Sequence, residues 1–281
     1  MESTNVRPRR RPILRRVLIA TTATVVVVVV AVASLTYVAF RRPPENSPED
    51  FLSRPRPPTG QVVVAAGASM TQASLGADWV GALRDRLGPT GFEFVNAGVN
   101  GNTSADLLAR LDDDVLACKP DAVILLIGTN DVRDGVPVDA YAATLQSIMD
   151  KLTRTGARVA IMSLPPLGED LKSPANHRLS TFNDVIQQVA DDYGATYLPL
   201  HERLVEVIRQ ERPAGTPTGS FSFPLALRTA FEHYVLRRSW DEVAAGNGLT
   251  VLTDHIHLSD RAGAIVEDLV AQWLTTPPSA S

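Results

Sequence analysis

The chain has 281 residues, 44% of them hydrophobic, which is enough for one domain of up to about 230 residues plus an appendage. Its single cysteine, Cys118, excludes an internal disulfide and is expected to be a buried structural thiol. Residues 1–42 hold eight arginines and one glutamate, and the rest of the chain holds 19 basic and 30 acidic side chains. An acidic body argues against nucleic acid as a partner.

The N-terminus combines a basic tail, predicted to be cytoplasmic over residues 1–16, with an apolar segment at 17–40 that contains no charged side chain. As a helix, these 24 residues would be about 36 Å long, enough to cross a membrane core of about 30 Å. More positive charge precedes the segment than follows it, so the body should lie outside the cytoplasm. The sequence therefore predicts a single-pass membrane anchor. The alternative is a signal peptide cleaved at the A-x-A pattern Ala31-Val32-Ala33, which would make the body a secreted protein.

Prolines, charges and small residues dominate the next segment, and we expect a linker at 41–60. Within it, residues 43–58 are predicted to form an extended tether that holds the body off the membrane. The folded domain is then expected over 61–275, followed by a disordered tail at 276–281.

Apolar runs alternate with amphipathic runs throughout this domain. The predicted strands are 62–66, 92–96, 122–127, 157–164 and 195–198, and the predicted helices are 77–87, 103–118, 138–155, 174–193 and 259–274. This order predicts an α/β fold with a parallel sheet and helices on both faces. Residues 202–250 interrupt this alternation of strands and helices. They contain predicted helical segments at 202–210 and about 225–245, on either side of a Pro/Gly-rich loop at 213–220. We expect an insertion that is either a lid or one wall of a substrate crevice. The alternative is that its aromatic residues only seal it onto the core.

Polar motifs follow several of the strands. Ser69 lies on a strand-to-helix turn after the first strand, and the run from Asn96 to Ser104 follows the second. Gly128-Thr129-Asn130-Asp131 follows the third strand, and Asp254-His255-Ile256-His257 precedes the last helix. Each motif alone could be a turn or a helix cap. Because ligands of open α/β sheets bind at the carboxyl ends of the strands, together they predict one site.

The residue types in these motifs suit acyl transfer. A serine hydroxyl is a poor nucleophile unless a base removes its proton, and a neutral imidazole is suited to that role near neutral pH. A carboxylate three residues before His257 can reach the other ring nitrogen and orient the ring. Neither a dinucleotide-binding G-x-G-x-x-G after the first strand nor a phosphate-binding GxxxxGK[ST] occurs in the sequence, and we expect no cofactor.

Together, the four motifs resemble the sequence blocks of the SGNH (GDSL-like) hydrolase family over about residues 61–273. The resemblance implies a three-layer α/β/α sandwich with a flavodoxin-like sheet, and a monomer. It implies that Ser69 is the nucleophile, His257 its base and Asp254 the carboxylate that orients the base. It also implies an oxyanion hole formed by the backbone amides of Ser69 and Gly101 and the side-chain amide of Asn130.

One position departs from the family pattern, since Ala68 stands where the family usually has Asp. A hydrogen bond that would brace the serine turn is therefore missing. We expect a serine esterase or lipase that cleaves lipid acyl esters or O-acetylated glycans through an acyl-enzyme. Two alternatives remain: an inactive module that binds an envelope glycan or lipid, and metal-assisted hydrolysis through Asp254, His255 and His257.

Overall fold

The computed structural model describes residues 11–56, 60–211 and 219–276. Within these residues, one sheet of five parallel strands runs in the order β2-β1-β3-β4-β5. The strands are β1 (Gln61–Gly67), β2 (Phe92–Gly98), β3 (Ala122–Leu126), β4 (Arg158–Met162) and β5 (Thr196–Leu198). This order confirms the expected flavodoxin-like sheet. Residues 1–10 of the predicted basic tail and 277–281 of the predicted C-terminal tail lie outside the described residues.

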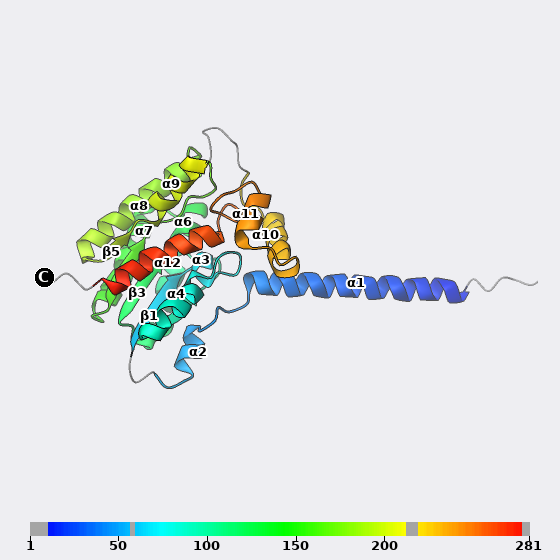
Figure 1. Cartoon of the computed structure of the whole chain (residues 1–281), viewed down its shortest axis with the longest axis horizontal. Coiled ribbons are helices and arrows are strands. Elements are labelled where there is room, and N and C mark those ends of the chain that lie inside the picture. The colour runs from blue at the N-terminus through cyan, green and yellow to red at the C-terminus, as the bar shows by residue number, and fades with distance from the viewer. Residues whose placement is uncertain (1–10, 57–59, 212–218, 277–281) are drawn as a thin grey trace, which may run out of the picture.

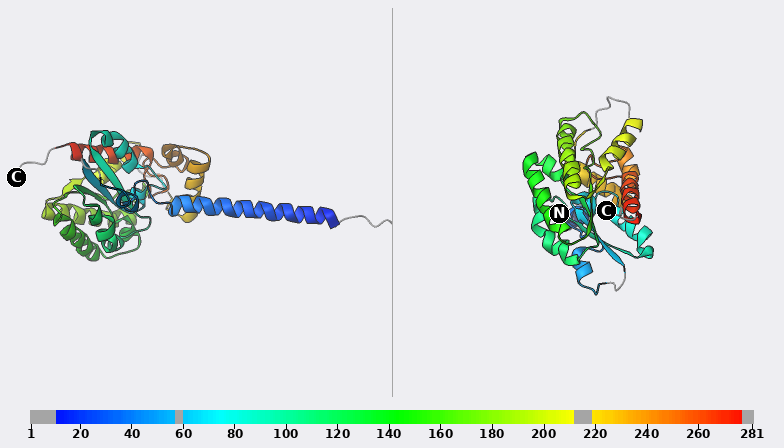
Figure 2. Two further views of the ribbon diagram at one scale, coloured as in Figure 1. Left: turned by 90° about the horizontal axis from the view of Figure 1, so that it is seen from below. Right: turned by 90° about the vertical axis from the view of Figure 1, so that its left-hand side faces the viewer.

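Helices cover both faces of the sheet and confirm the three-layer sandwich (Figure 1, Figure 2). One layer contains α4 (Trp79–Leu87), α9 (Leu200–Glu211) and α12 (Asp260–Thr275), and the other contains α5 (Ser104–Asp114), α7 (Val138–Thr153) and α8 (Pro174–Tyr193). Short 3-10 turns follow α4 and α5, namely η1 (Gly88–Thr90) and η2 (Leu116–Cys118). The central strands β1 and β3 are buried on both faces, as their continuous apolar runs predict. Cys118 is buried as expected, and burial raises the pKa of its thiol to about 11.

Capping residues fix where several helices begin and end. The Thr103 side chain accepts a hydrogen bond from the backbone of Asp106, and the Asp106 carboxylate accepts one from the backbone of Thr103, which starts α5. Ser259 caps α12 in the same position, and Gly194 ends α8 in the left-handed conformation. These local signals explain why the helix boundaries predicted from sequence lie close to the observed ones.

The N-terminal helix α1 (Arg11–Phe40) projects from the body (Figure 1). Its segment Arg15–Phe40 is long and apolar enough to cross a membrane, by length and composition. The valines in its middle are more than half exposed, whereas Ala39 near its end is fully buried. The last turns of α1 pack against α10 (Phe223–Ala230) and Leu75, so this end of the helix is part of the folded body.

Residues 41–56 differ from the extended tether that the composition predicts. They contain the short helix α2 (Pro48–Leu52), which a Ser47–Asp50 capping box starts and a proline at its first position favours. Phe51 is buried in the main core, and the backbone carbonyl of Asn46 accepts a hydrogen bond from the backbone N–H of Asn96 at 3.0 Å. The expectation of a tether was wrong here because Phe51 and the backbone of this stretch find partners on the domain.

The insertion contains α10, the π-helical turn η3 (Phe231–Val235) and α11 (Trp240–Gly246). The single helical piece expected at about 225–245 is interrupted, and Arg237 adopts a left-handed φ of 60° at the break. Trp240 is buried and stacks on His233 within the insertion, with ring centroids 3.7 Å apart. Ala244 of α11 is buried in the main core, so part of the insertion does seal onto the core. Most of the predicted loop at 213–220 lies outside the described residues.

Candidate active site

The polar motifs meet at the carboxyl edge of three adjacent strands. Gly67, the last residue of β1, pairs with Gly98 at the end of β2 and with Leu126 at the end of β3. The motifs that follow these strand ends contain Ser69, Gly101 and Asn130 respectively. The parallel register therefore brings three separate stretches of sequence to one edge of the sheet.

Ser69 is the first residue of the short helix α3 (Ser69–Gln72), directly after the turn that ends β1. Its side chain is partly exposed, in contrast to the buried residues on either side of it. Two glycines allow α3 to lie this close to the strand ends. A Cβ on Gly67 would lie 2.2 Å from the Thr71 hydroxyl oxygen, and a Cβ on Gly98 would lie 2.2 Å from the backbone nitrogen of Gln72. A side chain at Gly98 would therefore displace α3, and one at Gly67 would collide with both the Thr71 side chain and the Leu126 carbonyl of β3.

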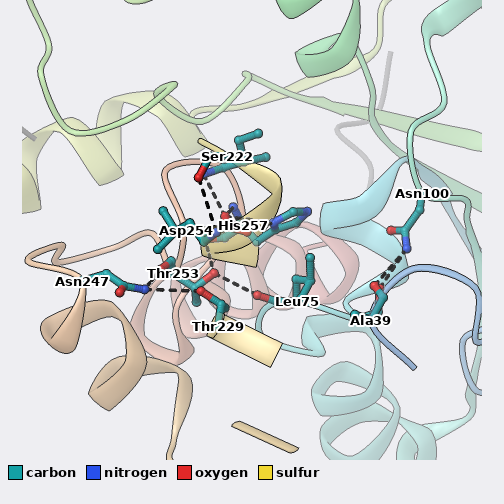
Figure 3. A network of polar contacts seen from close by, with 12 residues as sticks. Ala39, Leu75, Asn100, Ser222, Thr229, Asn247, Thr253, Asp254 and His257 are labelled. Carbon is teal, nitrogen blue, oxygen red and sulfur yellow. Dashed lines mark hydrogen bonds and ion pairs between the residues drawn. The ribbon is translucent and has the colours of Figure 1, made fainter. Parts of the chain in front are cut away.

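Asp254 and His257 form a buried pair on the loop before α12 (Figure 3). The ring Nδ1 of His257 lies 2.8 Å from Oδ2 and 2.9 Å from Oδ1 of Asp254. Oδ1 also accepts hydrogen bonds from the backbone N–H groups of Ile256 and His257. Burial by itself raises the pKa of Asp254, but the neighbouring His257 and these hydrogen bonds outweigh it and lower the pKa below its usual value. An ionised carboxylate at this position holds a proton on Nδ1 and leaves Nε2 free to act as a base.

The loop that contains this pair packs against the loop that follows Ser69. A bridge between Leu252 and Leu258 closes the histidine loop, and the Leu258 carbonyl accepts a hydrogen bond from the Ala77 N–H at 2.9 Å. The Thr253 hydroxyl donates to the Leu75 carbonyl at 2.9 Å (Figure 3). Both Ser69 and His257 are among the described residues, and no hydrogen bond joins their side chains.

Asn130, in the short helix α6 (Thr129–Arg133), lies beside the Gly101 turn. Its Nδ2 donates to the carbonyl of Asn102 at 2.9 Å, and its Oδ1 accepts from Nη1 of Arg133 at 3.1 Å. These two contacts fix the orientation of the amide and leave one N–H of Nδ2 for another acceptor. Gly101 has a φ of 79°, which glycine adopts without strain.

Two side chains without a predicted role hold these turns in place. Arg110 of α5 donates to the carbonyls of Gly67 at 3.0 Å and Ala97 at 2.9 Å, and its Nε donates to Oδ1 of Asn102 at 2.7 Å. The amide of Asn96 donates to a carbonyl of α3 at 2.7 Å and so links the end of β2 to the helix that begins at Ser69. Asn96 had a signal in the sequence, since it opens the second motif. Arg110 had none, because its partners are backbone carbonyls on two strands.

A second brace joins the second and third motifs. The carboxylate of Asp131 accepts hydrogen bonds from the backbone N–H of Ser104 at 2.9 Å and from its hydroxyl at 2.5 Å. Asp131 is buried, so this charge-assisted contact is shielded from water and fixes the start of α5 relative to α6. The turn that contains Gly101 is therefore held from both of its ends.

A cavity of about 410 Å³ opens beside the histidine loop. Its wall includes His255, Ile256 and Arg133, together with Phe221 from the insertion. The Phe221 ring also approaches the ring of His257 edge-on, with centroids 6.4 Å apart. The insertion thus supplies one wall of a crevice next to His257, and His255 lines the same crevice.

The chain is similar in sequence to known esterases. The sequence model of the GDSL-like Lipase/Acylhydrolase family matches residues 65–262. An acetylxylan esterase from Geobacillus stearothermophilus is 29% identical over 145 residues, which cover 48% of this chain and 66% of that protein. Esterase TesA from Pseudomonas aeruginosa is 35% identical over 114 residues, which cover 38% of this chain and 56% of that protein. The chain thus matches less than two thirds of the length of either relative.

Among solved structures, the acetyl xylan esterase AlAXEase has a similar fold. The TM-score is 0.59 at 21% identity, over 76% of this chain and 99% of that one. The family match covers the end of β1, the other four strands, all three polar motifs at the sheet edge and the Asp254–His257 loop. The chain belongs to the GDSL-like lipase/acylhydrolase family, a family of ester-cleaving enzymes.

Proposed function

We propose that this protein hydrolyses carboxylic esters through an acyl-enzyme, with Ser69 as nucleophile, His257 as base and Asp254 as the carboxylate that orients the base. The observation that supports this most is the His257 ring nitrogen held 2.8 Å from a fully buried carboxylate, on a loop bonded to the one that follows Ser69. Such a pair stabilises the imidazolium that forms when the serine gives up its proton.

The proposed reaction has two similar halves. Nε2 of His257 accepts the proton of the Ser69 hydroxyl while Oγ attacks the ester carbonyl carbon, and the carbonyl electron pair moves onto the oxygen. When this tetrahedral intermediate collapses, the bond to the alcohol breaks and the alcohol oxygen takes the proton from His257. Water then attacks the acyl group with His257 again as base, and the acid leaves as Ser69 regains its proton.

Three N–H donors are proposed to stabilise the negative oxygen of each intermediate. They are the backbone amides of Ser69 and Gly101 and the free N–H of the Asn130 side chain. Support comes from the register of β2, β1 and β3, whose neighbouring ends are each followed by one of the three motifs. The two hydrogen bonds that fix the Asn130 amide add to it. Because the donors are held before substrate binds, they stabilise the transition state without reorganisation.

The proposed site lies outside the cytoplasm, with α1 as a membrane anchor whose N-terminus is inside. Support comes from the length and composition of Arg15–Phe40 and from the arginines that precede it. The substrate is proposed to be a lipid acyl ester or an O-acetylated glycan, since the relatives are named an acetylxylan esterase and an esterase. A panel of esters from acetyl to palmitoyl distinguishes the two, because only a lipid esterase favours the long chains.

A second candidate function is a binding module with the same fold and no catalysis. Two observations favour it: Ala68 provides no side-chain cap for α3, and among the described residues no hydrogen bond joins the Ser69 side chain to that of His257. A fluorophosphonate reagent separates the two candidates because it labels only an activated serine.

Hydrolysis of p-nitrophenyl acetate by the full chain in detergent micelles tests the proposal. Replacing Ser69 by Ala should abolish turnover, because the hydroxyl that forms the proposed acyl-enzyme is removed. The matched control is Ser180→Ala, which removes an exposed hydroxyl from α8 and should leave the rate unchanged. Equal rates for Ser69→Ala and the wild-type protein would defeat the assignment.

A further inference from the structure

The insertion exposes a stripe of apolar side chains. Phe223, Leu227, Phe231 and Val235, here called the apolar stripe, recur every four residues along α10 and η3 and so lie on one side of the helix. Phe223 is 54% exposed, Phe231 44% and Val235 53%. Large apolar side chains gathered on one exposed helical face mark an interaction surface rather than ordinary surface variation.

The stripe is continuous with the apolar anchor helix. The rings of Phe40, at the end of α1, and Phe223 stack with centroids 5.3 Å apart. Behind this contact, Ala39 is buried against Ala226 and Ala230. Figure 1 and the left-hand view of Figure 2 show α10 alongside the last turns of α1, at the end of the body from which α1 projects. A bilayer that contains α1 would therefore have the apolar stripe at its surface.

Basic side chains lie on both sides of this junction. Arg41 and Arg42 follow α1 directly, and Arg237 follows η3, all three exposed. Arginines at the edge of an apolar helical face are placed to meet lipid phosphates while the apolar residues enter the acyl boundary. This charge pattern favours a lipid surface over a second apolar protein face.

Hydrogen bonds connect the same junction to the candidate active site. The Gln72 side chain, in the helix that begins at Ser69, donates to the Arg42 carbonyl at 2.7 Å. Its Oε1 accepts from the backbone N–H of Asn100, next to Gly101, at 2.5 Å. On the insertion side, the Tyr234 hydroxyl donates to the carbonyl of Ser74 at 2.7 Å. The helix that begins at Ser69 and the Gly101 turn are thus connected by hydrogen bonds to the end of α1, and the loop after α3 to the insertion.

We infer that the apolar stripe docks into the lipid–water boundary beside the anchor, so that the site takes its ester from the membrane surface. This inference rests on the proposed membrane anchoring of α1. The bound partner is a bilayer, with aromatic and aliphatic side chains buried at headgroup depth and arginines at the phosphates.

Tryptophan quenching in vesicles tests this docking. The full chain is reconstituted with Phe231→Trp, with Leu52→Trp as a matched control from α2, and with Val28→Trp as a marker within α1. Leu52 is 47% exposed, a fraction similar to the 44% of Phe231, but it lies on α2, away from the stripe (Figure 1). The native tryptophans are buried, so the wild-type signal can be subtracted. Lipids brominated near the headgroup end of the acyl chain should quench Phe231→Trp at least about twofold more than Leu52→Trp.

Each outcome separates one claim from another. Quenching of Val28→Trp with Phe231→Trp no more quenched than Leu52→Trp would overturn the docking while leaving the anchor intact. Strong protection of Phe231→Trp from bromine together with blue-shifted emission would indicate a protein partner and also overturn it. No quenching of Val28→Trp by lipids brominated near the methyl end of the acyl chain would overturn the anchor, because position 28 lies at the middle of α1. Hydrolysis of p-nitrophenyl acetate, measured on the same samples, tests the esterase assignment separately, because a soluble ester needs no membrane contact.

Discussion

Replacing Asp254 by Asn changes the chemistry of the buried pair while nearly preserving its shape. In the structure both carboxylate oxygens lie within 2.9 Å of Nδ1 of His257, and Oδ1 also accepts two backbone N–H groups. If the Asn oxygen keeps the backbone contacts, its NH₂ group faces Nδ1. That arrangement favours the ring tautomer with its proton on Nε2, which cannot accept the proton of Ser69. Comparable substitutions lower kcat by about 10⁴, or about 5 kcal/mol at the transition state.

The assay is p-nitrophenyl acetate hydrolysis by the full chain in detergent, with kcat and KM determined separately. Circular dichroism checks that the variant is folded, and Asp191→Asn on the exposed face of α8 is the matched control. We expect kcat to fall steeply and KM to change little, because the Asp254–His257 pair acts on proton transfer rather than on substrate binding. A kcat for Asp254→Asn within about tenfold of the wild-type value would refute the assigned role of the pair.

Four further outcomes are expected. Asn130→Ala should lower kcat/KM for the same ester by about a hundredfold to a thousandfold, as loss of one oxyanion donor does. Arg110→Ala removes contacts to two strand-end carbonyls and the Gly101 turn, so chemical denaturation should show a free energy of unfolding lower by about 2–4 kcal/mol. Gly98→Ala forces a Cβ against the backbone of α3 and should destabilise by about 1–3 kcal/mol, whereas Gly88→Ala, with open space around it, should change stability by less than about 1 kcal/mol. The pKa of Asp254 is lower in the folded protein than in the unfolded chain, so its charge stabilises the fold at any pH above the unfolded-state pKa. The Tm of the wild-type protein should therefore exceed that of Asp254→Asn near neutral pH, and this difference should shrink below about pH 4.

The fold and the candidate site were largely predictable because their signals are local. Continuous apolar runs predicted the central strands β1 and β3, which Ser69 and Asn130 follow, and Gly101 lies just after the edge strand β2. Since parallel strands end at a common edge, the sequence order was enough to predict that these residues meet. The pairing of Asp254 with His257 followed from their spacing on one short loop.

What escaped prediction depends on contacts between distant parts of the chain. Arg110 lies on an ordinary amphipathic helix, and only the folded sheet brings the carbonyls of Gly67 and Ala97 within its reach. The stretch around Phe51 has the composition of a linker, yet it is ordered because the Phe51 side chain packs into the main core of the domain. The contact of Phe40 with Phe223 joins two apolar segments that composition assigns separately to a membrane and to an insertion.

Reaction of the full chain with a fluorophosphonate, followed by peptide mass spectrometry, tests the central claim most directly. The account predicts one phosphonylated residue, Ser69, and loss of that adduct when His257 is replaced by Ala. An unlabelled protein, an adduct on another serine, or undiminished labelling of His257→Ala would contradict it.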